Sequence, residues 1–319
     1  MSDLRYHVEL TAPDIAPYRA GNTGVDYVTT FTAAEPGPHV GVFGLTHGNE
    51  ICGAITLDKL FRANVRPRRG KLTLAFNNVG AYREFDPRYP IASRYIDEDF
   101  NRLWSPATLD GPRNSAELQR ARAMRPIVEA VDYLLDLHSM QYATAPLMLA
   151  GLLAKSVTLA RQLGIPELIM CDAGHAAGPR MRDYGAFADP ASPKTALLIE
   201  AGQHWETRAA EVATDVTLRF LIALGTVTRD DVAALGGPDF AASPRQRVIR
   251  VTEAVTITGS RFEFVAPYVG LEVIPQQGTL IGRDGDREVR TPYDDCILIM
   301  PSRRLIRGQT AVRLGRYVD

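Results

Sequence analysis

Residues 39–78 read HVGVFGLTHGNEICGAITLDKLFRANVRPRRGKLTLAFNN, and this stretch indicates the class of fold. It opens with an apolar, strand-like run, HVGVFGL. Apolar residues then recur at Ile51, Ile55, Leu57 and Leu60, which is close to helical spacing. A second β-rich run, KLTLAFNN, follows the turn at Gly70. Strand, helix and strand in this order predict a βαβ unit, and therefore a sheet covered by helices.

Similar patterns lie on both sides of this unit. Three further runs read as strands: VDYVTTF (25–31), DYLLDLHSM (132–140) and TALLIEAG (195–202). A helix is predicted over 115–131, with Ser115 as its N-cap and a kink or break near Pro126. Another helix is predicted over 206–224, and it should end at Gly225.

The character of the sequence changes at LGGPDFAASPRQR (235–247). Gly236, Gly237, Pro238 and Pro244 are typical of a linker. After this segment, only β-type runs separated by Gly, Pro and Asp remain. We therefore expect two domains, an α/β domain of catalytic size over residues 1–235 and a small all-β domain over residues 245–319.

The composition excludes several classes of partner. The chain has 319 residues, of which 45% are hydrophobic, and 36 Lys and Arg nearly balance 37 Asp and Glu. This balance predicts no broad basic face for nucleic acid or a membrane surface, so we expect small-molecule partners. The sequence lacks an apolar run of roughly 18–20 residues and a signal-like N-terminus. Three separate cysteines (Cys52, Cys171 and Cys296) favour a reducing, cytoplasmic location.

Polar residues follow three of the predicted strands. His47 and Glu50 come after the first, His138 after DYLLDL, and Glu200 after TALLI. The carboxyl ends of strands are where open α/β sheets bind ligands, and buried polar groups need partners there. Two imidazoles and a carboxylate suit one Zn²⁺ ion, which would keep a fourth position open for water. We therefore expect one zinc site per chain.

The segment RYIDEDFNRLW (94–104) is the second dense group of polar residues. It contains Arg94, Asp97, Glu98, Asp99, Asn101 and Arg102. Apolar residues alternate with these charges, so parts of the segment should be buried. A partly buried Arg–Asn pair is well suited to binding a carboxylate, because the guanidinium donates two parallel hydrogen bonds and the amide adds a third.

Four strings, THGNE, RYIDEDFNR, LLDLHS and LLIEAG, occur in this order between residues 40 and 202. Together they resemble the succinylglutamate desuccinylase/aspartoacylase family, a branch of the zinc carboxypeptidase-like hydrolases. The resemblance implies an α/β fold with a zinc-carboxypeptidase-like mixed sheet flanked by helices. It also implies a small C-terminal all-β domain.

The resemblance implies a role for each residue of the proposed centre. His47, Glu50 and His138 match the family's zinc ligands. Asp99 matches the carboxylate that orients the first of these histidines. Glu200 matches the general base that activates water and then passes the proton to the leaving amine.

Further residues are expected to contact the substrate. By the same resemblance, Arg94 polarises the scissile carbonyl and stabilises the oxyanion, and Asn101 with Arg102 binds a substrate carboxylate. The Gly- and Pro-rich stretch AGPRMRDYGAFADPASP suggests a loop over the site. In that loop, Arg182 and Tyr184 are our candidates for substrate binding.

We therefore expect a zinc-dependent amidohydrolase that removes the acyl group from an N-acyl amino acid. Two alternatives stay open: a carboxypeptidase that acts on small peptides, and a non-catalytic ligand-binding relative. The sequence does not identify the acyl group, the amino acid, the pathway or the oligomeric state, so a homo-oligomer stays open. The roles of His204 and of the C-terminal β domain are open as well.

Overall fold

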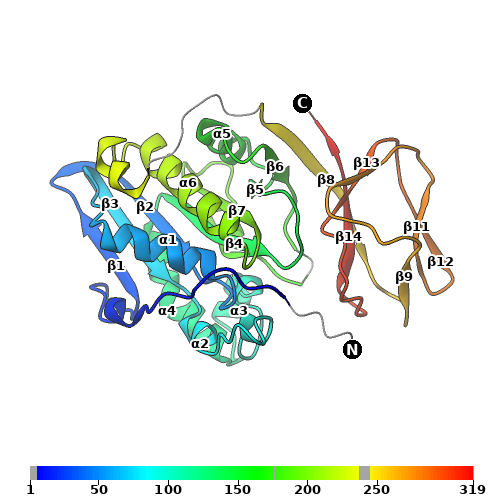
Figure 1. Ribbon diagram of the computed structural model, residues 1–319, viewed down its shortest axis with the longest axis horizontal. Helices are drawn as coiled ribbons and strands as arrows, with labels where there is room; N and C mark the ends of the chain where they lie inside the picture. The colour runs from blue at the N-terminus through cyan, green and yellow to red at the C-terminus, as the bar shows by residue number, and fades with distance from the viewer. Residues whose placement is uncertain (1–5, 176, 237–244, 319) are drawn as a thin grey trace.

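The structure is a computed structural model that describes residues 6–175, 177–236 and 245–318. Within these ranges, eleven strands form one mixed sheet in the order β1-β3-β2-β4-β7-β5-β6-β8-β14-β13-β10. Three more strands form a small second sheet in the order β12-β11-β9. Helices pack on both faces of the first half of the large sheet (Figure 1). The predicted mixed α/β fold is confirmed.

Four parallel strands form the centre of the large sheet. They are β2 (Glu35–Gly44), β3 (Arg69–Phe76), β4 (Tyr133–Met140) and β7 (Thr195–Gln203), and β1 (Val28–Thr32) is the antiparallel edge next to β3. Helix α1 (Ile51–Arg62) links β2 to β3, which confirms the predicted βαβ unit. Since β2 lies between β3 and β4, the chain reverses its direction of travel across the sheet there. Ligands bind at such a point, beyond the carboxyl ends of the strands.

Helices cover the two faces of the sheet according to the alternation of strand residues. Val42 and Leu197 belong to the core that includes α1, α5 (Ala154–Leu163) and α6 (Thr207–Ala223). Their neighbours Phe43 and Ala196 belong to the core on the other face, with α4 (Ala116–Ala130). Two short helices, α2 (Val79–Arg83) and α3 (Pro106–Leu109), lie in the segments that connect these layers.

Residues after 245 form strands, as predicted, but they do not all form a separate sheet. Strand β8 (Arg247–Thr256) pairs in parallel with β6 (Leu168–Cys171), and β14 (Thr310–Tyr317), β13 (Cys296–Ile299) and β10 (Glu272–Ile274) extend the large sheet. The small sheet contains β9 (Phe262–Phe264), β11 (Leu280–Asp284) and β12 (Arg287–Arg290). The division into two domains stays a prediction, and linker residues Gly237, Pro238 and Pro244 lie outside the described residues.

Some elements differ from expectation. The strand β5 (Leu147–Leu149), helix α5 and strand β6 were not predicted. Ser115 caps α4 by accepting a hydrogen bond from Leu118 N at 3.0 Å, as expected. The same helix continues through Pro126, so a break at that residue is wrong. Among the described residues, no helix is both long and apolar enough to cross a membrane.

Candidate metal and substrate site

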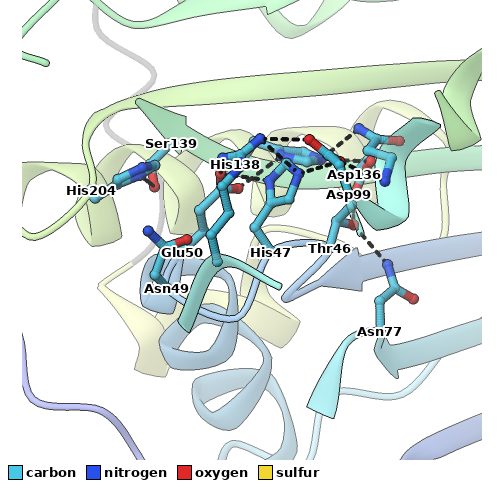
Figure 2. Close-up of polar contacts among 12 residues, drawn as sticks. Thr46, His47, Asn49, Glu50, Asn77, Asp99, Asp136, His138, Ser139 and His204 are labelled. Carbon is cyan, nitrogen blue, oxygen red and sulfur yellow. Dashed lines mark hydrogen bonds and ion pairs between the residues drawn. The ribbon is translucent and has the colours of Figure 1, made fainter. Parts of the chain in front are cut away.

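The LTHGNE turn brings two polar side chains to the end of β2. Gly48 packs so closely that a Cβ atom would lie 2.4–2.5 Å from backbone atoms of Ala81, Ser93 and Tyr82, so only glycine fits. The turn ends at Glu50, and α1 begins at the next residue. Because the chain bends this sharply, the side chains of His47 and Glu50 face each other (Figure 2).

Three buried side chains converge at the switch point. His47 Nδ1 lies 2.7 Å from Glu50 Oε1, and His138 Nδ1 lies 2.8 Å from Glu50 Oε2. One ligand atom from each of the three residues lies within 4.8 Å of the other two. His138 comes from β4, the strand adjacent to β2, so the sheet order brings it to the turn. The structure therefore joins the three predicted ligands in one cluster.

The outer nitrogen of each imidazole faces a carboxylate. His47 Nε2 lies 2.9 Å from Asp99 Oδ1, and His138 Nε2 lies 2.7 Å from Asp136 Oδ2. Thr46 Oγ1 donates to Asp136 Oδ1 at 2.6 Å, which holds this carboxylate in place (Figure 2). With a metal ion bound, each histidine would carry its ring proton on Nε2 and turn the Nδ1 lone pair to the centre of the cluster.

Asp136 is a residue of the candidate site that the sequence analysis missed. It precedes His138 by two residues on β4, so both side chains lie on one face of the strand. The string Asp-x-His within a buried strand was the available signal, because a buried carboxylate there needs a donor close by.

The donor set fits a divalent metal ion. Glu50 Oε2 accepts no hydrogen bond, although His138 Nδ1 lies only 2.8 Å away. A close contact of this kind, without a hydrogen bond, is what two ligand atoms of one cation would show. Two imidazoles and one carboxylate, with both rings held by outer carboxylates, are also a ligand set typical of hydrolytic metal sites.

Electrostatics keep the acidic members of the cluster ionised. Burial alone would raise the pKa of Glu50, but the facing His47 and His138 outweigh it and hold that pKa well below its usual value. For His138, burial opposes the charged form, but Asp136 and Glu50 raise its pKa well above the usual value. Glu50 is therefore negatively charged, as a carboxylate that binds a metal must be.

Glu200 lies beside the cluster on the adjacent strand β7. It pairs in register with His138, and its Oε2 is buried without a hydrogen bond. Burial is the main cause that raises the pKa of Glu200 to about 8. A carboxylate with a raised pKa in a cleft beside a metal site is suited to accept and return a proton.

The segment 94–104 supplies basic groups to the same site. Arg94 Nη2 lies 3.1 Å from Asp99 Oδ2, and its Nη1 lies 3.4 Å from Glu50 Oε1. Asn101 Oδ1 accepts a hydrogen bond from Met181 N at 2.8 Å, which fixes the amide group. Arg102 lies next to it, and burial lowers the pKa of its guanidinium to about 10. These side chains all line one cavity with the metal-binding cluster.

A buried carboxylate on α4 shapes this segment. Glu117 Oε1 accepts from Ile96 N at 2.7 Å, and Glu117 Oε2 accepts from Asp97 N at 3.0 Å and Glu98 N at 3.2 Å. In return, Asp97 Oδ2 accepts a hydrogen bond from Ala116 N at the start of the helix. Because the loop is tied to α4 at successive residues, the arginines at its two ends are held over the strand ends.

The cavity has a volume of about 630 Å³ and reaches the C-terminal strands. Arg313 of β14 lines it, and its guanidinium makes no hydrogen bond or ion pair within the described residues. Arg180 also lines it and is held by Asp172 at 2.6 Å and Asp183 at 2.6 Å. Arg180 was a weaker candidate for an anionic group of the substrate, and Arg313 was not predicted. An arginine inside a β-strand pattern, such as the one in TAVRLGRY, is the signal that pointed to Arg313.

Arg182 and Tyr184 do not line the cavity. Arg182 is buried and donates to Ala150 O at 2.9 Å and Ala196 O at 3.3 Å. Tyr184 packs edge-on against Trp104, and its hydroxyl donates to Glu129 at 2.7 Å. Their placement argues against substrate contact, because the loop turns these two side chains toward the sheet and α4. We therefore do not carry them into the proposed function.

His204 is the remaining residue whose role was open. It lines the cavity, and its Nδ1 lies 2.8 Å from Ser139 Oγ (Figure 2). Burial is the main cause that lowers the pKa of His204 to about 3, so the ring is neutral at ordinary pH. A neutral, buried histidine held by a hydroxyl is a hydrogen-bonding group and not a counter-charge.

Comparison with protein families found one match. Residues 36–222 match the model of the succinylglutamate desuccinylase/aspartoacylase catalytic domain. This span contains the turn at β2, the 94–104 segment, β4 and β7. No curated protein matched the sequence.

Solved structures with the same fold carry related names. A succinylglutamate desuccinylase from Vibrio parahaemolyticus shares 15% identity, with 92% of this chain and 87% of that one covered at a TM-score of 0.66. A succinylglutamate desuccinylase/aspartoacylase from Rhodobacter sphaeroides shares 17% sequence identity, and the match covers 92% of this chain and 89% of that one at a TM-score of 0.63. The product-bound ectoine utilization protein EutE (DoeB) from Ruegeria pomeroyi shares 17% sequence identity, and the match covers 90% of this chain and 88% of that one at a TM-score of 0.61. At these identities the similarity shows the fold.

Proposed function

The chain belongs to the succinylglutamate desuccinylase/aspartoacylase family, and from this membership we propose that it is a zinc-dependent hydrolase of N-acyl amino acids. The observation that carries the proposal is the cluster of His47, Glu50 and His138 next to the buried, unbonded carboxylate of Glu200. Together these groups provide a metal site and a base at one end of a cavity.

His47, Glu50 and His138 would hold the zinc ion, one per chain. A divalent ion held there would lower the pKa of a nearby water molecule and polarise the scissile carbonyl. Glu200 would accept the proton of the attacking water and pass it to the leaving amide nitrogen. Burial supports this role, because it raises the proton affinity of the carboxylate toward the value that a base needs near neutral pH.

The basic residues would bind and orient the substrate. Arg94 would donate to the carbonyl oxygen as negative charge develops on it, since its guanidinium is held in place beside Glu50 and Asp99. Asn101 and Arg102 would bind the carboxylate of the amino acid. Arg313 has no partner in the described part of the chain, so it is a further candidate for an anionic group on the same side.

We propose a cytoplasmic location on the evidence of the three cysteines, which are free and buried. A homo-oligomer stays a hypothesis.

The test is amine release from a panel of N-acyl amino acids and dipeptides, with the protein loaded with zinc or treated with chelator. We expect chelator-sensitive cleavage of acylated amino acids, and restoration by zinc. A Glu200→Gln variant should keep its metal and lose turnover by about 100- to 10,000-fold. Cleavage of the dipeptides alone would favour the carboxypeptidase. If the metal-loaded protein cleaves nothing, the proposal is wrong and a ligand-binding role takes its place.

A further inference from the structure

Three of the arginines that line the cavity form one group beside the metal-binding cluster. Arg102, Arg180 and Arg313 line the cavity together, and all three act electrostatically on His175. Arg180 is neutralised by Asp172 and Asp183, whereas Arg102 bonds the carbonyl oxygen of Asn101 and lies 3.9 Å from Asp99. This basic side of the cavity is therefore suited to anionic groups of a ligand.

The other side is lined mainly by uncharged side chains. We define the neutral wall as five uncharged side chains that line the cavity: Tyr6, Ser139, Gln141, Gln203 and His204. Gln141 Nε2 donates to the Tyr6 hydroxyl at 2.8 Å, and Gln203 Nε2 donates to Gln141 O at 3.2 Å. Ser139 and His204 are bonded at 2.8 Å. These bonds hold the wall in one arrangement.

The position of His204 shows where the wall lies relative to the metal-binding cluster. In Figure 2, His204 and Ser139 lie on one side of His138 and Asp99 lies on the other, and Arg102 Nη2 is 3.9 Å from Asp99 Oδ2. His204 Nδ1 faces Ser139, and its Nε2 makes no hydrogen bond within the described residues. The wall therefore adjoins the metal-binding cluster on the side away from Arg102.

The proposed roles of Arg102 and the metal-binding cluster fix the direction in which a substrate would lie between the basic side and the neutral wall. If Arg102 binds the carboxylate of the amino acid and the scissile amide lies at the metal and Glu200, the acyl group must extend away from Arg102. It then meets the neutral wall. Arg94 acts on this region but is already paired with Glu50 and Asp99, so a carboxylate on that acyl group would be buried without a free counter-charge, which is strongly unfavourable.

We propose that the neutral wall is the acyl subsite and that it selects an uncharged acyl group, of which acetyl is the simplest. This inference rests on the proposed deacylase function and names the acyl half of its substrate. His204 would donate or accept one hydrogen bond there through Nε2. An acyl group that ends in a carboxylate, such as succinyl, would be rejected.

Two other cations border this region. Arg303 lines the cavity, but it is exposed, and its guanidinium stacks on the Tyr142 ring at 4.5 Å. An ion pair between the exposed Arg303 and a ligand carboxylate would contribute little to binding, because water and salt screen it. Arg94 already forms ion pairs with Glu50 and Asp99, so it is not free to neutralise a second carboxylate.

The test compares matched pairs of substrates that differ only in the acyl group. N-acetyl and N-succinyl forms of aspartate, glutamate, arginine and leucine are given to the zinc-loaded enzyme. We expect kcat/KM for the best acetyl substrate to exceed that of its succinyl partner by on the order of 100-fold or more. Dissociation constants for the same pairs, measured by calorimetry on the Glu200→Gln variant, should show the same order without turnover.

A charge placed in the wall should reverse the preference. Gln141 is half-buried at the edge of the wall, so a Gln141→Arg variant should fold, and it should raise the succinyl-to-acetyl ratio at least about tenfold. Gln119→Arg adds the same charge on the exposed face of α4 and should leave the ratio unchanged.

The outcomes separate this inference from the proposed function. Equal or better cleavage of the succinyl substrates by the natural protein overturns the neutral acyl subsite and leaves the deacylase function intact. Tight binding of acetyl over succinyl forms without any turnover supports the subsite and overturns the deacylase function. If neither form is bound or cleaved, both proposals are wrong.

Discussion

Glu200 combines two properties, a place on the strand next to His138 and a buried carboxylate oxygen, Oε2, that accepts no hydrogen bond. Burial is the first cause that raises its pKa from 4.5 to about 8. The folded protein therefore holds this proton more strongly than the unfolded chain does. It follows that the contribution of Glu200 to the free energy of unfolding is fully present below pH 4.5 and is lost as pH rises through about 8.

We predict that Glu200→Gln raises the free energy of unfolding of the metal-free protein. This gain over the natural protein should be larger at pH 8 than at pH 5. Glutamine carries no charge to bury, so the variant should gain on the order of a few kcal/mol at the higher pH. Urea unfolding of both metal-free proteins at the two pH values measures this difference. If the two proteins differ equally at both values, Glu200 does not titrate in this window.

Arg102 is predicted to act on the substrate carboxylate and not on the reaction at the metal. Arg102→Ala should lower kcat/KM by roughly 10- to 100-fold for substrates with a free carboxylate, because a charged hydrogen bond is lost. The methyl esters of the same substrates should be much less affected. Arg113→Ala, which removes an exposed arginine of the same region, is the control. Equal losses on acids and esters would remove Arg102 from this role.

At the scale of elements, the junction of α4 with the 94–104 segment organises the substrate side of the site. Three consecutive backbone N–H groups, from Ile96 to Glu98, donate to the carboxylate of Glu117. The side chain of Ser115 caps the same helix end and donates to Glu98 Oε1 at 2.6 Å. Helix and loop thus satisfy each other's backbone groups, and the loop cannot move without exposing them.

We predict that Glu117→Gln destabilises the protein by roughly 2–4 kcal/mol, because an amide has one acceptor oxygen and leaves buried N–H groups unpaired. The KM of the substrate should rise, since Arg94 and Arg102 are attached to this loop. Thermal unfolding and steady-state kinetics measure the two effects. Glu129→Gln, an exposed change on the same helix, should show neither effect. If Glu117→Gln behaves like that control, the loop is held by other contacts.

At the scale of the whole molecule, residues on both sides of the predicted domain boundary build one cavity. Arg313 lies on β14 and Met300 directly follows β13, whereas the metal-binding cluster lies at β2 and β4. The pairing of β8 with β6 makes the large sheet continuous across the boundary. Leu168 and Met170 of β6 pack in one apolar cluster with Ile249 of β8.

We predict that a fragment of residues 1–235 does not fold stably. Without β8, the edge of β6 and its apolar cluster would be exposed, and an open edge of this kind promotes aggregation. Size-exclusion chromatography and circular dichroism of the fragment, next to the full chain, measure the effect. A monomeric fragment that melts cooperatively and binds zinc would instead show that residues 1–235 are an independent domain.

Much of the fold followed from local sequence. The βαβ unit, the strands β4 and β7, the cap at Ser115 and the β-only C-terminal region were predicted from periodicity and turn residues. These signals are local, because side-chain period and turn chemistry act within a few residues. The short elements β5, α5 and β6 were not predicted, since β5 and β6 are only three and four residues long. Sheet order is also absent from such local signals.

The sequence by itself determined which residue types could form a metal site, because His47, Glu50, His138 and Glu200 all lie at or just beyond the carboxyl ends of predicted strands. Only the tertiary structure decided which partners they meet. Asp136 faces His138 because both lie on one face of β4, and Arg313 reaches the cavity because β14 pairs with β8. Arg182 turns inward, away from the cavity. A loop side chain's direction depends on packing against distant elements, which no local pattern encodes.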